Sequence, residues 1–137
     1  MEVFRIEVKS HYFKPDGIDV CEGTCKGVFS SLSMFCTLWS YLPYEHKSAH
    51  VSPEAEELYF TPDMLCACPS INVLSDWFYG KDFINLFQEA PVELVKYTIH
   101  DIDLAEVDMS DNQTVFIPLK DACTREVLDM NELIKYM

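Results

Sequence analysis

The sequence predicts an α+β fold in a single globular domain covering residues 1–137, with a small, mainly antiparallel sheet of about four strands against one long helix and several short helices. Apolar and polar residues alternate with period two in several short segments, which is typical of strands that bury one face. One longer segment has helical spacing instead, and prolines divide much of the remaining chain into short pieces.

The first predicted strand covers residues 3–9. Its apolar face holds Phe4, Ile6 and Val8, and its charged face holds Arg5, Glu7 and Lys9. This alternation is the pattern of a half-buried strand. Residues 14–17, Lys-Pro-Asp-Gly, follow it and predict a turn, because proline fixes φ and glycine permits backbone angles that other residues avoid.

The long helix is predicted from about Thr24 to Leu42, because the apolar residues there fall on one stripe at helical spacing until Pro43 ends it. Residues 43–61 have little periodicity, so we expect a long loop with one helical turn. Further short helices are predicted from capping residues and prolines, and they cover residues 62–68, 70–79 and 81–90.

The other strands are predicted in the C-terminal half of the chain. Residues 95–99 alternate clearly, and residues 102–109 and 114–119 supply a third and a fourth strand. Residues 110–113 form the turn between the last two strands. Residues 129–132, Asp-Met-Asn-Glu, have the spacing of a capping box and predict a C-terminal helix.

Acidity is the strongest global feature of the chain. It carries 23 Asp and Glu residues against 10 Lys and Arg residues, which gives a formal net charge of −13. A surface of this charge repels phosphate backbones, so direct binding to nucleic acid is not expected, whereas docking onto a basic protein is accelerated. The sequence also lacks a glycine-rich phosphate loop and any cluster of basic and aromatic residues, which argues against nucleotide chemistry.

The sequence predicts a protein of a reducing compartment, and we expect it in the cytoplasm. No stretch approaches the ~20 apolar residues of a membrane span, and the first residues lack the basic-then-apolar order of a signal peptide. We therefore expect no membrane partner, and thiols rather than disulfides at Cys21, Cys25, Cys36, Cys66, Cys68 and Cys123. The sequence does not decide whether the chain associates with copies of itself.

One interpretation is a small cysteine hydrolase or acyl-transferase. Cys25 stands at the predicted start of the long helix, where the helix dipole would stabilise a thiolate, and His100 follows on a downstream strand. The segment Val20-Cys21-Glu22-Gly23 resembles the cysteine motif of transglutaminase-like domains, and Cys25-Lys26-Gly27 resembles that of other cysteine hydrolases. The resemblance implies Cys25 or Cys21 as the nucleophile and His100 as the base.

Metal binding is the second chemistry that the sequence raises. The pairs of potential ligands are Cys21 and Cys25, Cys66 and Cys68, and His46 and His50. Each spacing departs from the paired knuckles of structural zinc sites. We therefore predict neither a metal nor another cofactor.

The carboxylates concentrate in two runs. The first consists of Glu54, Glu56 and Glu57, and the second of Asp101, Asp103, Glu106, Asp108 and Asp111. Carboxylates spaced along a strand and a turn can stand in for a phosphate backbone and occupy the basic groove of a nuclease or another nucleic-acid enzyme. The alternative is a solvated strand edge, protected by charge against pairing with other sheets.

The sequence favours a binding protein over an enzyme, because its charge is evident whereas no complete catalytic set is present. We predict an acidic inhibitor that blocks a basic partner protein through the two carboxylate runs. A nucleic-acid-processing enzyme is one candidate partner. The protein would then act as a nucleic-acid mimic, in the manner of phage-encoded anti-defence inhibitors and toxin-immunity proteins.

Overall fold

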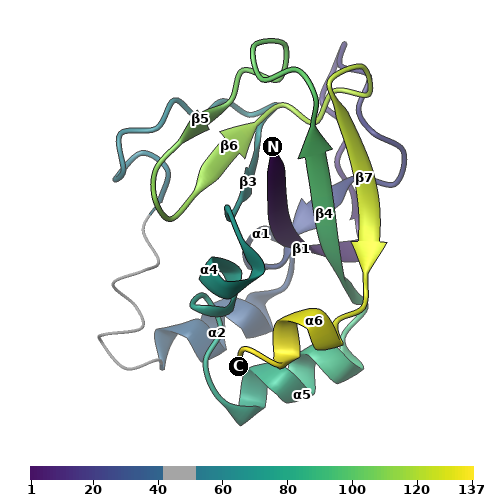
Figure 1. Ribbon diagram of the computed structural model, residues 1–137. Coiled ribbons are helices and arrows are strands. Elements are labelled where there is room, and N and C mark those ends of the chain that lie inside the picture. Colours follow the sequence, from purple (N-terminus) through teal and green to yellow (C-terminus); the bar gives the residue numbers. More distant parts are fainter. Residues whose placement is uncertain (42–51) are drawn as a thin grey trace.

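The computed structural model describes residues 1–41 and 52–137. Its strands are β1 (Glu2–Tyr12), β2 (Cys25–Gly27), β3 (Leu65–Ala67), β4 (Val92–Ile99), β5 (Asp108–Met109), β6 (Thr114–Phe116) and β7 (Cys123–Leu128). They form two antiparallel sheets, a larger one with the order β2-β1-β4-β7 and a smaller one with the order β3-β6-β5 (Figure 1).

Most of the helices lie in the lower part of the molecule in the view of Figure 1. The described helices are α1 (Val28–Ser31), α2 (Ser33–Ser40), α4 (Ile71–Ser75), α5 (Lys81–Glu89) and α6 (Asn131–Ile134). Within the described residues, no helix has the length and apolar character needed to cross a lipid bilayer.

The register of the larger sheet determines which side chains share a face. β4 pairs with β1 from Thr98 opposite Glu2 to Val92 opposite Val8, and β7 continues the sheet on the far side of β4. Residues directly opposite each other in antiparallel strands point to the same face. From Glu2 to Val8, even-numbered residues of β1 therefore share one face of the sheet and odd-numbered residues share the other.

The even-numbered face packs against the helices. Ile6 and Val8 are buried there together with Leu94 of β4, against Phe35 of α2 and Phe78. Aromatic rings dominate this core, and the rings of Phe78 and Phe35 meet edge to face with centroids 6.2 Å apart. Such pairs stabilise a core by about 0.5–1.5 kcal/mol beyond the effect of their buried area.

The odd-numbered face packs partly against the smaller sheet. Val3, Val95 and Tyr97 are buried there, and the Tyr97 ring lies edge to face on Phe116 of β6 at 5.2 Å between centroids. The two sheets also meet in a bridge between Phe4 and Cys68, whose backbone groups exchange two hydrogen bonds. The sheets are thus joined near the first residues of β1.

The predicted α+β class and the four-stranded antiparallel sheet are confirmed. The strands expected at residues 3–9 and 95–99 are present as β1 and β4, and the helix expected at residues 81–90 is α5. The N-terminal cap of α4 also follows the prediction, because the Ser70 hydroxyl accepts a hydrogen bond from the Val73 N–H at 3.1 Å.

The prediction of one long helix from Thr24 to Leu42 is wrong. Residues 25–27 pair with β1 as β2, and the backbone at Leu32 is extended, with φ −127° and ψ 108°, which separates α1 from α2. The serines of this segment are poor helix formers because their hydroxyls compete for backbone groups. The Ser30 hydroxyl, for example, donates to the Gly27 carbonyl at 3.0 Å.

Two further predictions are corrected by long-range pairing. Residues 65–67, expected in a helix, form β3 because they pair with β6. Of residues 102–109, expected as a strand, only Asp108 and Met109 form one, because a series of turns precedes them and Glu106 has a left-handed φ of 51°. In both cases partners distant in the sequence override local propensity.

Candidate functional site

The structure joins the two carboxylate runs into one surface. The Tyr59 N–H donates a hydrogen bond to Asp108 Oδ2 at 3.0 Å, and the Ser110 hydroxyl donates to Glu56. Residues 52–59 therefore lie beside β5 and the turn that follows it. We call this surface the acidic edge, and its carboxylates are Glu54, Glu56, Glu57, Asp101, Asp103, Glu106, Asp108 and Asp111.

Buried contacts hold the backbone of the acidic edge in place. Leu58 is buried against Val115 and Ile117, so the first run is anchored to the smaller sheet. In the second run, Asp101 Oδ1 accepts a hydrogen bond from the Leu104 N–H at 3.0 Å and stabilises the turn after β4. The carboxylates are therefore presented from an ordered backbone.

The carboxylates of the acidic edge have no local counter-ions. None of them forms an ion pair with a residue in the described part of the chain, and residues 52–80 and 97–119 contain no Lys or Arg. On the larger sheet the opposite holds, because Lys96 lies 3.1 Å from Glu126 and 3.9 Å from Glu2. No basic side chain of the described residues therefore balances the negative charge of the acidic edge.

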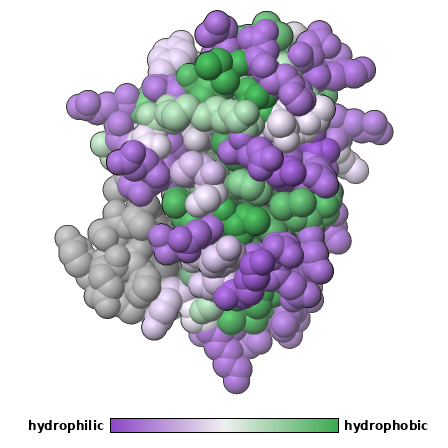
Figure 2. All heavy atoms as spheres, viewed as in Figure 1, coloured by the Kyte–Doolittle hydropathy of each residue, from purple (hydrophilic) through white to green (hydrophobic). Residues whose placement is uncertain are grey.

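Large apolar side chains are exposed beside these carboxylates. The exposed fractions are 66% for Tyr59, 54% for Ile102, 51% for Met109 and 45% for Leu104. Figure 2 shows hydrophobic and hydrophilic groups intermixed over the upper part of the molecule, where these turns lie. Scattered apolar residues are common on protein surfaces, but a group of them within a charged rim is typical of interaction surfaces.

Cys25 does not lie at a helix N-terminus as predicted. It is buried at the start of β2, and its thiol donates to the carbonyl oxygens of Gly23 at 3.2 Å and Lys9 at 3.6 Å. Burial raises the pKa of the Cys25 thiol, and the nearby Glu7 carboxylate raises it further. This environment disfavours the thiolate that nucleophilic catalysis requires.

The structure does not join either cysteine to His100 in a catalytic pair. Cys21 is buried, its thiol donates to the Cys123 carbonyl at 3.1 Å, and burial raises its pKa. His100 is exposed, and its ring nitrogen Nε2 lies 3.3 Å from the hydroxyl of Thr124. Within the described residues, no hydrogen bond connects Cys21 or Cys25 with His100.

The potential metal ligands are placed as follows. Cys66 lies on β3 and Cys68 follows that strand, and all cysteines are free thiols. His46 and His50 lie outside the described residues. In residues 1–41 and 52–137, no group of three or more His, Cys, Asp or Glu side chains is arranged to hold a metal ion.

A buried charged network was missed by the sequence reasoning. The half-buried prediction for β1 is wrong, since Arg5 and Glu7 are only 5% and 1% exposed. Glu7 accepts hydrogen bonds from Arg125 Nη2 at 2.7 Å and from the Tyr97 hydroxyl at 2.6 Å, and its Oε2 lies 3.1 Å from Arg5 Nε. Its Oε1 also accepts from the Cys25 N–H at 3.1 Å.

The network explains several local features of the sequence. Gly23 adopts a φ of +82°, and a Cβ there would lie 3.2 Å from Arg125 Nη1, so this position favours glycine for two reasons. Burial raises the pKa of the Tyr97 hydroxyl, and the neighbouring carboxylate of Glu7 adds to this effect. The only sequence signal was the pair of opposite charges two residues apart, Arg5 and Glu7, on one face of a strand.

No protein-family model matches the chain, and neither does any curated protein or solved structure. Function is therefore inferred from the residues and their geometry alone. Of the groups described above, six of the eight carboxylates of the acidic edge are exposed, and none of the eight forms an ion pair within the described residues, whereas Cys21, Cys25 and the Glu7 network are buried.

Proposed function

We propose that the protein is an acidic inhibitor that blocks a basic partner protein by placing the acidic edge against it. The observation that carries the proposal is the absence of local counter-ions around these carboxylates within the described residues. Carboxylates without internal counter-ions remain free to attract external cations, and this attraction accelerates encounter with a basic surface.

The apolar residues of the acidic edge supply the second part of the interaction. Charge steers a partner and sets its orientation, but buried aromatic and aliphatic anchors usually provide most of the affinity. Tyr59, Ile102 and Met109 stand exposed beside the carboxylates and are suited to this role. The proposed contact is therefore an apolar centre surrounded by carboxylates.

The partner class is inferred from where the carboxylates lie in the fold. They lie on turns and on β5, the outer strand of the smaller sheet, and successive negative charges along an edge are what a phosphate-binding groove accepts. We therefore propose a nucleic-acid-processing enzyme as the target, with the protein acting in the cytoplasm as a nucleic-acid mimic. Self-association through the same edge is the alternative that the test below separates.

The test compares two variants with equal net charge. The edge variant neutralises exposed carboxylates that make no hydrogen bond described above, namely Glu54→Gln, Glu57→Gln, Asp103→Asn, Glu106→Gln and Asp111→Asn. The control variant neutralises exposed carboxylates elsewhere, namely Asp16→Asn, Asp19→Asn, Glu22→Gln, Glu89→Gln and Asp121→Asn. Each tagged protein is used to capture partners from lysate of its source cells at low and high salt, and bound proteins are identified by mass spectrometry.

We expect the wild type and the control variant to capture one stoichiometric basic protein that is released as salt rises, because ions screen charge-led docking. The edge variant should lose most of this capture. Equal capture by both variants would show that net charge acts without a defined surface and would contradict the proposal. Recovery of the chain itself as the sole partner would favour self-association.

No observation in the described residues favours the cysteine hydrolase interpretation. Burial raises the pKa of both Cys21 and Cys25. A thiol probe tests this reading directly, since a catalytic cysteine would react faster at neutral pH than a free thiol.

A further inference from the structure

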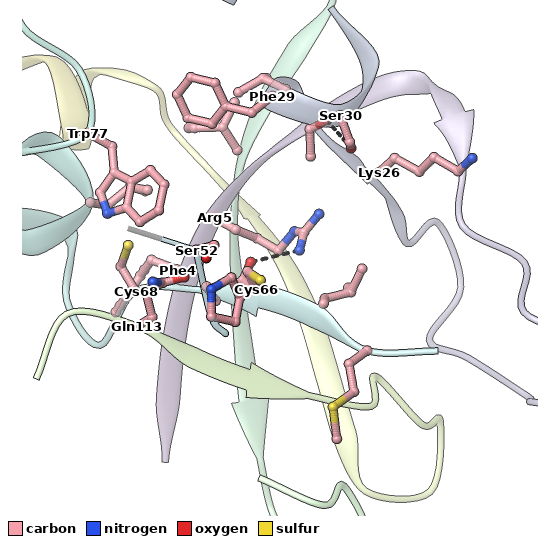
Figure 3. Close-up of a pocket in the computed structure, with 18 of the residues that line it drawn as sticks. Phe4, Arg5, Lys26, Phe29, Ser30, Ser52, Cys66, Cys68, Trp77 and Gln113 are labelled. Atoms are coloured by element: carbon pink, nitrogen blue, oxygen red, sulfur yellow. Dashed lines mark hydrogen bonds between the residues drawn. The ribbon is translucent and has the colours of Figure 1, made fainter. Parts of the chain in front are cut away.

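A pocket of about 640 Å³ lies between β1, β3, α1 and α4, and no carboxylate of the acidic edge lines it (Figure 3). Its volume falls in the range of small-molecule sites, about 300–1,000 Å³. Most of its lining is apolar, and the larger side chains include Phe4, Phe29, Trp39, Leu74, Trp77 and Phe78. A pocket of this kind accommodates the body of an apolar ligand.

The charged residues that line the pocket are basic, although the protein as a whole is acidic. The chain has 23 acidic and 10 basic residues, yet the described lining contains Arg5 and Lys26 and no Asp or Glu. A pocket in so acidic a protein would be expected to contain carboxylates. Its charge instead complements an anion.

Arg5 is held in place before any ligand arrives. Its Nη1 donates to the Cys66 carbonyl at 2.8 Å, its Nη2 donates to the Cys25 carbonyl at 3.3 Å, and its Nε faces Glu7. A guanidinium has five N–H groups, so these contacts leave N–H capacity on both Nη atoms. Glu7 pairs with both Arg5 and Arg125, so its single negative charge does not neutralise both guanidinium groups.

Lys26 lies on β2 at the rim of the pocket and is exposed. It forms no ion pair with any residue that the structure describes. In Figure 3 the Arg5 guanidinium lies between Lys26 on one side and the rings of Trp77 and Phe29 on the other. A cationic end and an aromatic end are thus presented within one pocket.

We propose that this pocket binds an amphipathic carboxylate, with its carboxylate between Arg5 and Lys26 and its apolar body against Phe29 and Trp77. The buried guanidinium is already oriented, so binding costs little side-chain entropy there. A carboxylate can accept bidentate hydrogen bonds from a guanidinium, which a neutral or cationic head group cannot do. The proposed ligand contacts none of the carboxylates of the acidic edge, so its test does not depend on the proposed inhibitor function, although Ser52 and Pro53, which precede Glu54, also line the pocket.

The test uses three probes with the same alkyl chain and different head groups: decanoate, decanol and decylammonium. The chain contains two tryptophans, Trp39 and Trp77, and both line the pocket, so tryptophan fluorescence reports occupancy directly. We expect a saturable change with decanoate, at one site per chain by calorimetry, and an affinity at least about tenfold above that of decylammonium. The net charge of −13 favours the cation everywhere else, so this order can arise only from a local cationic site.

Two charge-reversal variants locate the site. Lys26→Glu and Lys81→Glu change the net charge equally, and both lysines are exposed, but only Lys26 lines the pocket. Lys26→Glu should weaken decanoate binding about tenfold because it replaces attraction with repulsion, whereas Lys81→Glu should bind like the wild type. The proposal is overturned if decanoate does not bind, if decylammonium binds as tightly, or if the two variants lose affinity equally.

Discussion

On β1, Ile6 and Val8 are buried among the helices, while Arg5 and Glu7 are buried on the opposite face of the same strand. The first pair contacts aromatic and aliphatic side chains such as those of Phe35 and Leu94. The second pair contacts an arginine, a tyrosine hydroxyl and backbone groups. Adjacent residues are thus equally inaccessible to water but stabilised by different interactions.

The two faces should respond differently to substitution. Apolar contacts are non-directional, so a small loss of volume removes a proportionate part of their stabilisation. A buried charged network depends on every partner, because removing one member leaves the others desolvated and unpaired. Position on β1, rather than burial, should therefore determine how severe a substitution is.

Among substitutions, the largest effect is expected for Glu7→Ala. It leaves Arg5 and Arg125 without the carboxylate that they share, and removal of one partner from a buried ion pair costs about 3–5 kcal/mol. Urea denaturation of the wild type and the variant measures the difference in the free energy of unfolding. A loss under about 1 kcal/mol would show that the network is not maintained in solution.

The contrast between the two faces also shows what the sequence can and cannot predict. Alternation in residues 3–9 correctly located the strand, because period two follows directly from backbone geometry. It failed on the burial of Arg5 and Glu7, since Arg125, the second counter-ion of Glu7, lies far away in the sequence. β7, which carries Arg125, was not predicted at all, because its polar residues give no apolar signal.

The candidate site, too, could be predicted from the sequence only in part. The carboxylates of the acidic edge could be named from the sequence, because runs of Asp and Glu are local features. Their assembly could not be predicted, since it depends on the contacts of Tyr59 with Asp108 and of Glu56 with Ser110. The pocket was missed for the same reason, because its two cationic residues are separated in sequence and come together only through the pairing of β1 with β2.

High pH is a change of solvent rather than of sequence, and it should destabilise the protein through buried thiols on both faces of the sheet. Burial raises the pKa of Cys123 to about 12 and also raises the pKa of Cys68. The unfolded chain releases these protons from about pH 8.5, whereas the folded chain holds them. Stability is therefore fully present below about pH 8.5 and decreases as pH rises towards 12, by about 1.4 kcal/mol per pH unit for each such thiol.

The measurement is the free energy of unfolding from pH 8 to pH 11 under reducing conditions. Cys68→Ala should make the dependence on pH shallower, because it removes one buried thiol. Cys36→Ser is the matched control, since Cys36 is exposed, and it should leave the slope unchanged. Equal slopes in the wild type and Cys68→Ala would contradict this account.

Ile6→Val tests the apolar face at a site adjacent to Glu7. It removes one methylene from a buried position and should cost about 0.5–1.5 kcal/mol. The comparison with Glu7→Ala is made in the same urea series. If Ile6→Val were as damaging as Glu7→Ala, burial alone would explain both results and the distinction between the two faces would fail.

The smallest effect is expected for Lys135→Ala. This variant tests whether the burial of an ion pair or the distance between its charged atoms determines its contribution to stability. Lys135 Nζ lies 2.9 Å from Glu132 Oε2, close to the 2.7 Å between Arg125 Nη2 and Glu7 Oε1. Both residues of the first pair are exposed, so water and salt screen their attraction and ordering the side chains offsets what remains. The free energy of unfolding of Lys135→Ala should therefore equal that of the wild type within the error of the measurement. A loss as large as that of Glu7→Ala would mean that contact distance, rather than desolvation, determines the strength of ion pairs in this protein.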